Sequence, residues 1–133
     1  LGGPIGIGPY ADRRDEVFAV WKPAVAELAQ YQNVVAKVGG IQMVVNGYGW
    51  HERDQPPTSD QLVEANRPWY DYMFEQFGPD RCMFESNFPV DRLSCSYTVL
   101  WNQFKKLTRG FSTDERAAMF HDTAMRVYRL ARL

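Results

Sequence analysis

The stretch from Arg81 to Asp91, RCMFESNFPVD, constrains the fold more than any other part of the chain. A mostly apolar run follows the turn signal Gly78-Pro79-Asp80 and stops at a polar loop that contains Pro89. Such a run is typical of a parallel strand whose two faces are both covered. In α/β folds the polar groups that carry chemistry follow the carboxyl ends of these strands. We therefore expect a buried strand that delivers polar side chains to a site.

The order of the remaining elements favours an α/β fold with parallel strands and flanking helices. Apolar residues at three- and four-residue spacing predict a first helix over 12–30, kinked or split at Pro23. A β-branched strand over 34–39 follows and ends in Gly39-Gly40. A long loop over 41–57 leads to a helix that begins at Thr58, which forms a capping box with Gln61. Strands that alternate with helices imply right-handed crossovers between parallel strands.

Three further helical segments are expected. The helix that begins at Thr58 should stop at Arg67, restart at Pro68 and end at Gly78. A helix over 93–109 should end at Gly110, and a last helix should run from the capping box at Ser112 to about residue 132. The side chains expected to face the core from the first, third and last helices are Val17, Val20, Trp21, Ala24, Val25 and Leu28; Tyr97, Leu100, Trp101, Phe104 and Leu107; and Ala117, Phe120, His121, Ala124, Val127, Tyr128 and Ala131.

Charge and cysteine content exclude several classes of protein. The formal net charge is −1 over 133 residues and the basic residues are dispersed, which disfavours nucleic acid and membrane surfaces as partners. No apolar run reaches transmembrane length. Cys82 and Cys95 are predicted to be reduced thiols of a cytoplasmic protein. Two strands cannot close a sheet, and the chain opens in a Gly/Pro-rich segment, so we expect a fragment of a larger domain.

Residues 78–89, GPDRCMFESNFP, resemble the last barrel strand of the amidohydrolase-related family, the branch of the amidohydrolase superfamily that includes lactone hydrolases and decarboxylases. That strand reads roughly G-x-D-R-x-x-F-G-S-D-x-P. Residues 33–39 are similar to the family's seventh strand, and residues 120–128 to its closing helix. Residues 1–4 are similar to the segment after a histidine that ends the sixth strand. The resemblance implies that residues 1–133 are one domain fragment, the C-terminal part of a (β/α)8 TIM barrel.

Two departures from the family pattern lie at the end of this strand. Asn87 stands where a catalytic aspartate is usual, and Glu85 stands where a glycine is usual. Asparagine donates or accepts a hydrogen bond but takes no proton at neutral pH. If Asn87 points into the barrel, period-two alternation sends Glu85 and Met83 inward, and Lys37 inward on the neighbouring strand. Val35 and Gly39 would face inward with Lys37.

Glu85 then has two interpretations. In the first, it supplies the base or a metal-binding oxygen, and Asn87 orients substrate or water. In the second, it forms an interior ion pair with Lys37, since an isolated buried charge is very costly. Strand alternation predicts that the two side chains face one another inside the barrel, and the second interpretation predicts that they form an ion pair.

The loops after the two strands supply the other candidates. His51 is predicted to be catalytic, as an acid, a base or a ligand. Arg53 can clamp a substrate carboxylate bidentately, and Lys37, Trp50 and Asp91 are the remaining predicted substrate-binding residues. The alternative is a set of surface loop residues bonded to one another.

The resemblance implies a hydrolase of a C–O or C–N bond, acting on a lactone-like carboxylated small molecule. A non-oxidative decarboxylase and a barrel that binds a ligand without catalysis are the alternatives. The family includes metal-dependent and metal-independent members. A divalent ion such as zinc would take its main ligands upstream of Leu1, while Asn87 in place of aspartate favours weak or absent metal binding. The fragment alone is expected to be inactive, and a homo-oligomer is allowed.

Overall fold

The computed structural model describes residues 5–131, and within them two short parallel strands lie side by side. β1 (Ala36–Val38) and β2 (Cys82–Phe84) pair in register, with Ala36 opposite Cys82 and Val38 opposite Phe84. The connection between them contains α2 (Ser59–Phe77), as a crossover between parallel strands requires. The predicted α/β class and parallel pairing are confirmed for this part of the chain. Both strands are shorter than the apolar runs that predicted them.

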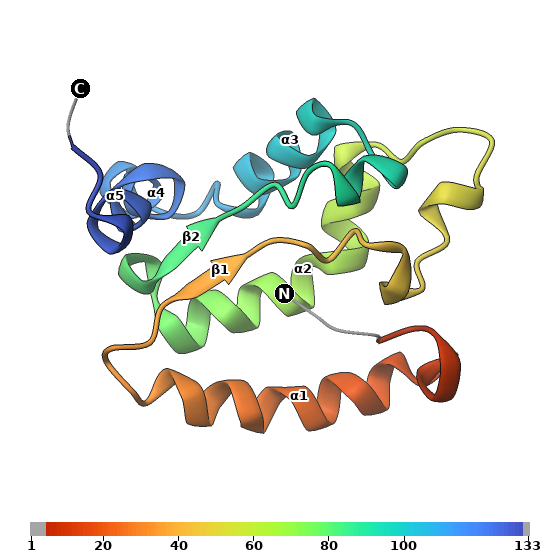
Figure 1. The fold of residues 1–133 in the computed structure, drawn as a ribbon, viewed down its shortest axis with the longest axis horizontal. Coiled ribbons are helices and arrows are strands. Elements are labelled where there is room, and N and C mark those ends of the chain that lie inside the picture. Colours follow the sequence, from red (N-terminus) through yellow and green to blue (C-terminus); the bar gives the residue numbers. More distant parts are fainter. Residues whose placement is uncertain (1–4, 132–133) are drawn as a thin grey trace.

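The other helices are arranged around this pair (Figure 1). α1 (Arg14–Ala29) precedes β1 and packs on α2, while α3 (Tyr97–Leu107), α4 (Thr113–Ala117) and α5 (Thr123–Tyr128) follow β2. A π-helical turn, Ala118–Asp122, joins α4 to α5 and packs against β2. Four short 3-10 turns lie in the loops before β2, at Gly8–Tyr10, Val44–Asn46, Trp50–Glu52 and Pro79–Arg81, and one lies after it, at Val90–Leu93.

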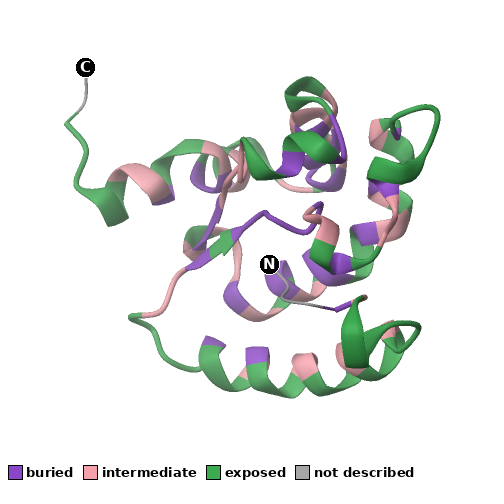
Figure 2. Ribbon diagram, turned by 45° about the vertical axis from the view of Figure 1, so that its right-hand side comes forward, coloured by how far each residue is buried: buried purple, intermediate pink, exposed green. Residues whose placement is uncertain are grey.

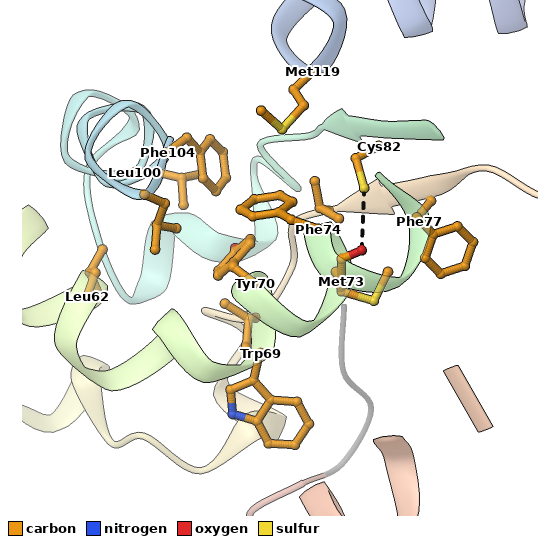
Figure 3. Close-up of a cluster of buried hydrophobic side chains, with 14 of the residues drawn as sticks. Leu62, Trp69, Tyr70, Met73, Phe74, Phe77, Cys82, Leu100, Phe104 and Met119 are labelled. Carbon is orange, nitrogen blue, oxygen red and sulfur yellow. Dashed lines mark hydrogen bonds between the residues drawn. The ribbon is translucent and has the colours of Figure 1, made fainter. Parts of the chain in front are cut away.

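One face of the strand pair packs against the helices. Ala36, Val38 and Cys82 are buried there, and the Cys82 thiol donates to the Met73 carbonyl of α2 at 3.9 Å. Figure 3 shows this cluster, in which side chains of α2, α3 and the π-helical turn meet. Phe84 of β2 packs against this cluster, with its ring centroid 4.4 Å from that of Phe104, 4.7 Å from that of Phe120 and 6.0 Å from that of Phe74. Alternation therefore places Lys37 of β1 and the buried Met83 of β2 on the opposite face of the pair.

Three helix starts follow from local hydrogen bonds. The Thr58 side chain accepts from the Gln61 backbone N–H, and the Gln61 side chain accepts from the Thr58 N–H. Ser112 and Glu115 form the same reciprocal pair before α4. Ser96 caps α3 through Val99. Both predicted capping boxes, and the predicted end of α2 at Gly78, are confirmed.

The predicted split at Pro23 and the predicted restart at Pro68 are wrong, while a kink at Pro23 stays a prediction. α1 runs without interruption through Pro23, and α2 runs through Pro68. A proline removes one helical hydrogen bond, and packing on both sides of it can outweigh that loss. In α1, Trp21 lies before Pro23 and Val25 after it, and both belong to or pack against the same core cluster. Tertiary contacts therefore override the local signal.

Several predicted helix limits and core positions also differ. α3 begins at Tyr97, because the N–H groups of Ser94 and Cys95 both bond to the Asp91 carbonyl and hold a separate turn. Its last residue is Leu107 and its C-cap is Thr108, whereas the predicted C-cap was Gly110. The predicted last helix is divided by the π-helical turn, which changes the face that α5 presents to the core. The predicted core side chains that are exposed in the structure are Val20, Ala24, Leu28, Tyr97, Ala117, His121, Val127, Tyr128 and Ala131.

α1 shows this difference most clearly. Half of its residues are exposed, and the others are intermediate or buried (Figure 2). Val20 is 74% exposed, whereas Val25 is buried against the core. An apolar residue at helical spacing can therefore lie on an uncovered face of the described chain.

Candidate active site

On the face of the strand pair that carries Lys37, an ion pair links β1 to the segment after β2. Lys37 Nζ lies 2.5 Å from Glu85 Oε2, and the two side chains are 50% and 26% exposed. The hydrogen bond and charge of Glu85 raise the pKa of Lys37. The prediction that the two side chains meet is confirmed. They are partly exposed in the described chain, so the cost that makes buried charges pair does not by itself explain the contact.

Asn87 lies two residues beyond Glu85 in an unusual backbone conformation. Its φ of 53° is in the left-handed region, which asparagine adopts more readily than most residues. Its side-chain Nδ2 donates to Asp91 Oδ1 at 2.7 Å, and its carbonyl accepts from the Asp91 backbone N–H at 3.2 Å. The loop thus folds back so that Asp91 forms hydrogen bonds with both the side chain and the backbone carbonyl of Asn87.

Asp91 is fully buried, although the sequence predicted a substrate-binding residue there. Burial raises the pKa of this carboxyl to about 6, against the lowering by the Asn87 amide and the Gln42 backbone. Its second oxygen, Oδ2, has no hydrogen-bond partner in the described part of the chain. Direct contact of Asp91 with a substrate remains a prediction, and in this structure its contact is with Asn87.

The glycine pair that ends β1 leaves room for these side chains. A Cβ on Gly39 would meet the Glu85 backbone oxygen and lie 2.5 Å from Glu85 Cγ. A Cβ on Gly40 would lie 3.4 Å from Asn87 Nδ2, and the φ of Gly40 is +74°. The two glycines therefore let Glu85 and Asn87 approach the β1 backbone closely.

Buried amides, which sequence analysis missed, brace the loops behind the site. Gln42 donates to the Gln103 side chain of α3 at 3.2 Å, and Ser94 donates to the Gln42 carbonyl at 2.5 Å. Asn46 bonds to the carbonyls of Gly40 and Ile41. These residues carry no sequence signal, because each is a single polar residue whose burial depends on tertiary packing. The nearest to such a signal is the pair Asn46-Gly47, which is typical of an ordinary turn.

The long loop and the loop after β2 meet in a cleft of about 290 Å³. Trp50, His51 and Arg53 line it from the long loop, and Arg92 and Ser94–Ser96 line it from the other side. The Arg53 guanidinium lies 4.1 Å over the Trp50 ring, which holds the cation in place. His51 Nε2 lies 3.6 Å from Glu52 Oε1. The cleft therefore has a cationic wall suited to an anionic group.

The predicted site residues fall into two groups. Lys37, Glu85, Asn87 and Asp91 make one set of contacts, and Trp50, His51 and Arg53 line the cleft. The segment 85–92 joins the two groups, because Arg92 of the cleft directly follows Asp91. Lys37 and Glu85 meet at the strand ends, while His51 lies in the cleft and pairs with Glu52.

The described residues do not fit a metal centre on their own. Across residues 5–131 no three His, Cys, Asp or Glu side chains gather closely enough to hold an ion. Glu85 is engaged by Lys37, and Asp91 by Asn87. Cys82 and Cys95 are free and buried, and burial raises the pKa of each thiol to about 12. Neither thiol is therefore a nucleophile or a ready metal ligand at neutral pH.

Two further points complete the description of the chain. Within the described residues, no helix combines the length and apolar character needed to cross a bilayer. The similarity of residues 1–4 to a segment after a family histidine lies outside the described residues.

Comparison with known proteins places this geometry in a family. Residues 2–130 match the model of a family described as amidohydrolase. The chain is 43% identical over 113 residues to the uncharacterized protein y4mH of Sinorhizobium fredii. This match covers 85% of the chain and 34% of that protein. It is 31% identical over 120 residues to L-fucono-1,5-lactonase of Burkholderia multivorans. This match covers 90% of the chain and 38% of that protein.

Two crystal structures of an amidohydrolase from Burkholderia multivorans are also similar. One, with bound zinc, has a TM-score of 0.75 at 29% identity and covers 88% of the chain and 39% of that protein. The other, with bound HEPES, has a TM-score of 0.77 at 30% identity and covers 90% of the chain and 40% of that protein. The chain thus spans little more than a third of the length of the proteins that it matches.

Proposed function

This chain belongs to the amidohydrolase family, and from that premise we propose that the protein is a hydrolase that opens a lactone of a carboxylated small molecule. The observation that carries the proposal is the 31% identity, over 90% of the chain, to a protein named for lactone hydrolysis. In this proposal β1 and β2 are neighbouring strands of a (β/α)8 barrel. Their carboxyl ends open on the face where such barrels carry out chemistry. The setting that we propose is cytoplasmic, with a small molecule as the partner.

Lactone opening needs few groups. The oxygen of a water molecule bonds to the carbonyl carbon, the ring C–O bond breaks, and a proton from the water ends on the ring oxygen that leaves. The product is a hydroxy acid. The protein must therefore orient and deprotonate water, stabilise the developing oxyanion, and deliver a proton to the leaving oxygen.

The predicted residues can take these roles. Glu85 is a partly exposed carboxylate just beyond β2 and is the proposed base, with Lys37 Nζ 2.5 Å away as its ion-pair partner. Asn87 is proposed to orient water or substrate. His51 is the proposed acid for the leaving oxygen, and Arg53 the clamp for a substrate carboxylate. The cationic wall of the cleft supports the last of these roles.

The proposal does not require a metal ion. A related crystal structure contains zinc, and zinc bound near a lactone carbonyl would polarise it. Because the described residues do not build a metal centre, none of the roles above depends on one.

The test uses the full-length protein with its metal content measured. We expect base consumption, followed with a pH indicator, on sugar lactones and carboxylated lactones. Release of CO2 from carboxylated aromatics, without lactone opening, would favour a decarboxylase. Saturable binding of these compounds without turnover would favour a barrel that only binds a ligand. The Asp71→Asn variant is the matched control, because Asp71 is an exposed helix residue paired only with Arg67 among the described contacts.

A further inference from the structure

The amide of Asn87 is held in one orientation by its hydrogen bond to Asp91. Its Nδ2 lies 2.7 Å from Asp91 Oδ1, and this nitrogen is also the Asn87 atom nearest to where a Gly40 Cβ would be, at 3.4 Å. The opposite orientation would place the amide oxygen against a carboxylate oxygen. An ionised carboxylate only accepts hydrogen bonds, so two acceptors would then face each other. The contact with Asp91 therefore fixes which end of the amide is the nitrogen.

The other end of the amide points elsewhere. The two terminal atoms of a planar amide diverge from the same carbon, so Oδ1 is directed away from both Asp91 and Gly40. Asn87 is only half-buried, and its left-handed backbone turns it out of the strand. Asp91, by contrast, is fully buried, and its carboxylate accepts a hydrogen bond from the Asn87 amide.

We propose that Asp91 is a positioning residue that fixes the Asn87 amide, so that Asn87 presents its oxygen, a hydrogen-bond acceptor, to the reacting water or substrate hydroxyl. This inference rests on the proposed function and extends it by giving Asn87 a defined polarity. An acceptor without a titratable proton can orient a water molecule while Glu85 removes its proton. The buried carboxylate behind it explains why an asparagine at this position has only one useful orientation.

An exchange of the two side chains tests the pair. Asp91→Asn keeps the size of the side chain but can either donate or accept, so the Asn87 amide is no longer held one way. Asn87→Asp places two carboxylates 2.7 Å apart, which repel. The double variant, Asn87→Asp with Asp91→Asn, restores one donor facing one acceptor and still presents an acceptor outward.

We expect kcat to fall by about tenfold or more in each single variant, the size of one charge-assisted hydrogen bond, with KM changed by less than about twofold. The double variant should recover most of the activity and melt at a higher temperature than Asn87→Asp. Asp71→Asn should behave like the wild type. Double-variant activity no better than the product of the two single losses would overturn the inference, as would an Asp91→Asn variant of normal kcat.

A spectroscopic measurement separates this inference from the proposed function. In the wild type, the side-chain NH2 resonances of Asn87 should respond to the titration of Asp91 and should shift in Asp91→Asn. A wild type that opens no lactone but shows this response would refute the proposed function and leave the held amide intact. Asn87 NH2 resonances that ignore both changes would refute the held amide whatever the activity.

Discussion

Lys37 Nζ and Glu85 Oε2 lie 2.5 Å apart across the carboxyl ends of two parallel strands, yet both side chains remain partly open to solvent. An ion pair at this exposure contributes little to stability, typically below about 1 kcal/mol. The contact is compatible with both interpretations of Glu85, as a base or metal-binding residue and as an ion-pair partner of Lys37. Substitution of the carboxylate distinguishes them.

Replacing Glu85 with Gln keeps the shape of the side chain and removes its charge. If Glu85 is the base, kcat of the full-length protein should fall by about a hundredfold or more, the usual contribution of a general base. The free energy of unfolding should change by less than about 1 kcal/mol, because the pair is partly exposed. Steady-state kinetics and urea unfolding measure the two quantities. A folded Glu85→Gln variant with near-normal turnover would leave Glu85 as an ion-pair partner only.

Gly39→Ala should destabilise the protein by roughly 1–3 kcal/mol, the range for overpacking a close contact. The added methyl group would meet the backbone oxygen of Glu85, which cannot move aside as a flexible side chain could. Gly110→Ala is the control, since no atom lies within 4 Å of a Cβ built there. Urea unfolding of both variants checks the prediction, and equal stabilities would contradict the close packing of β1 on the segment after β2.

The features of this chain that could be predicted from its sequence are those that depend on a local signal. The capping boxes at Thr58 and Ser112 depend on residues three positions apart, and the meeting of Lys37 with Glu85 follows from strand alternation. The features that could not be predicted are those that depend on packing between residues far apart in the sequence. Helix propensity at Pro68 is outweighed by the aromatic contacts of α2, and the π-helical turn that reorients Tyr128 has no sequence signature. The burial of Asp91 could not be foreseen, because it depends on the left-handed turn at Asn87.

The pH dependence of stability should report the buried Asp91. Burial raises its pKa to about 6, above the ordinary value of 3.8, although Asn87 and the Gln42 backbone lower it and Glu85 raises it further. Tyr70 of α2 and Cys95 are the other titratable groups whose pKa values respond to this carboxyl. Between these two pH values the folded protein holds a proton that the unfolded chain has lost. Stability contributed by this group is therefore full below about pH 4 and is lost as the pH rises to about 6.

The Asp91→Asn variant cannot titrate at this position. The melting temperature of the variant minus that of the wild type should therefore become more positive as the pH rises from 4 to 7, whatever its value at pH 4. Thermal unfolding in matched buffers measures this difference. A difference that is flat across the range would mean that Asp91 keeps its ordinary pKa. Asp71→Asn, at an exposed position, should show such a flat difference.

Arg53 should determine how tightly a carboxylated substrate binds. Its guanidinium is held 4.1 Å over the Trp50 ring, in a cleft that also presents Arg92. Arg53→Gln removes the charge, so KM for a carboxylated lactone should rise by about tenfold or more, since hydrogen bonds to charged groups contribute about 1.5–3 kcal/mol. KM for a neutral lactone of the same ring size should stay within about twofold, because the lost contact is to the carboxylate. Arg67→Gln, on the exposed face of α2, is the control for loss of one positive charge. An equal rise for both lactones would show that Arg53 shapes the cleft without recognising the anion, and no rise for either would exclude the cleft as the substrate's anion site.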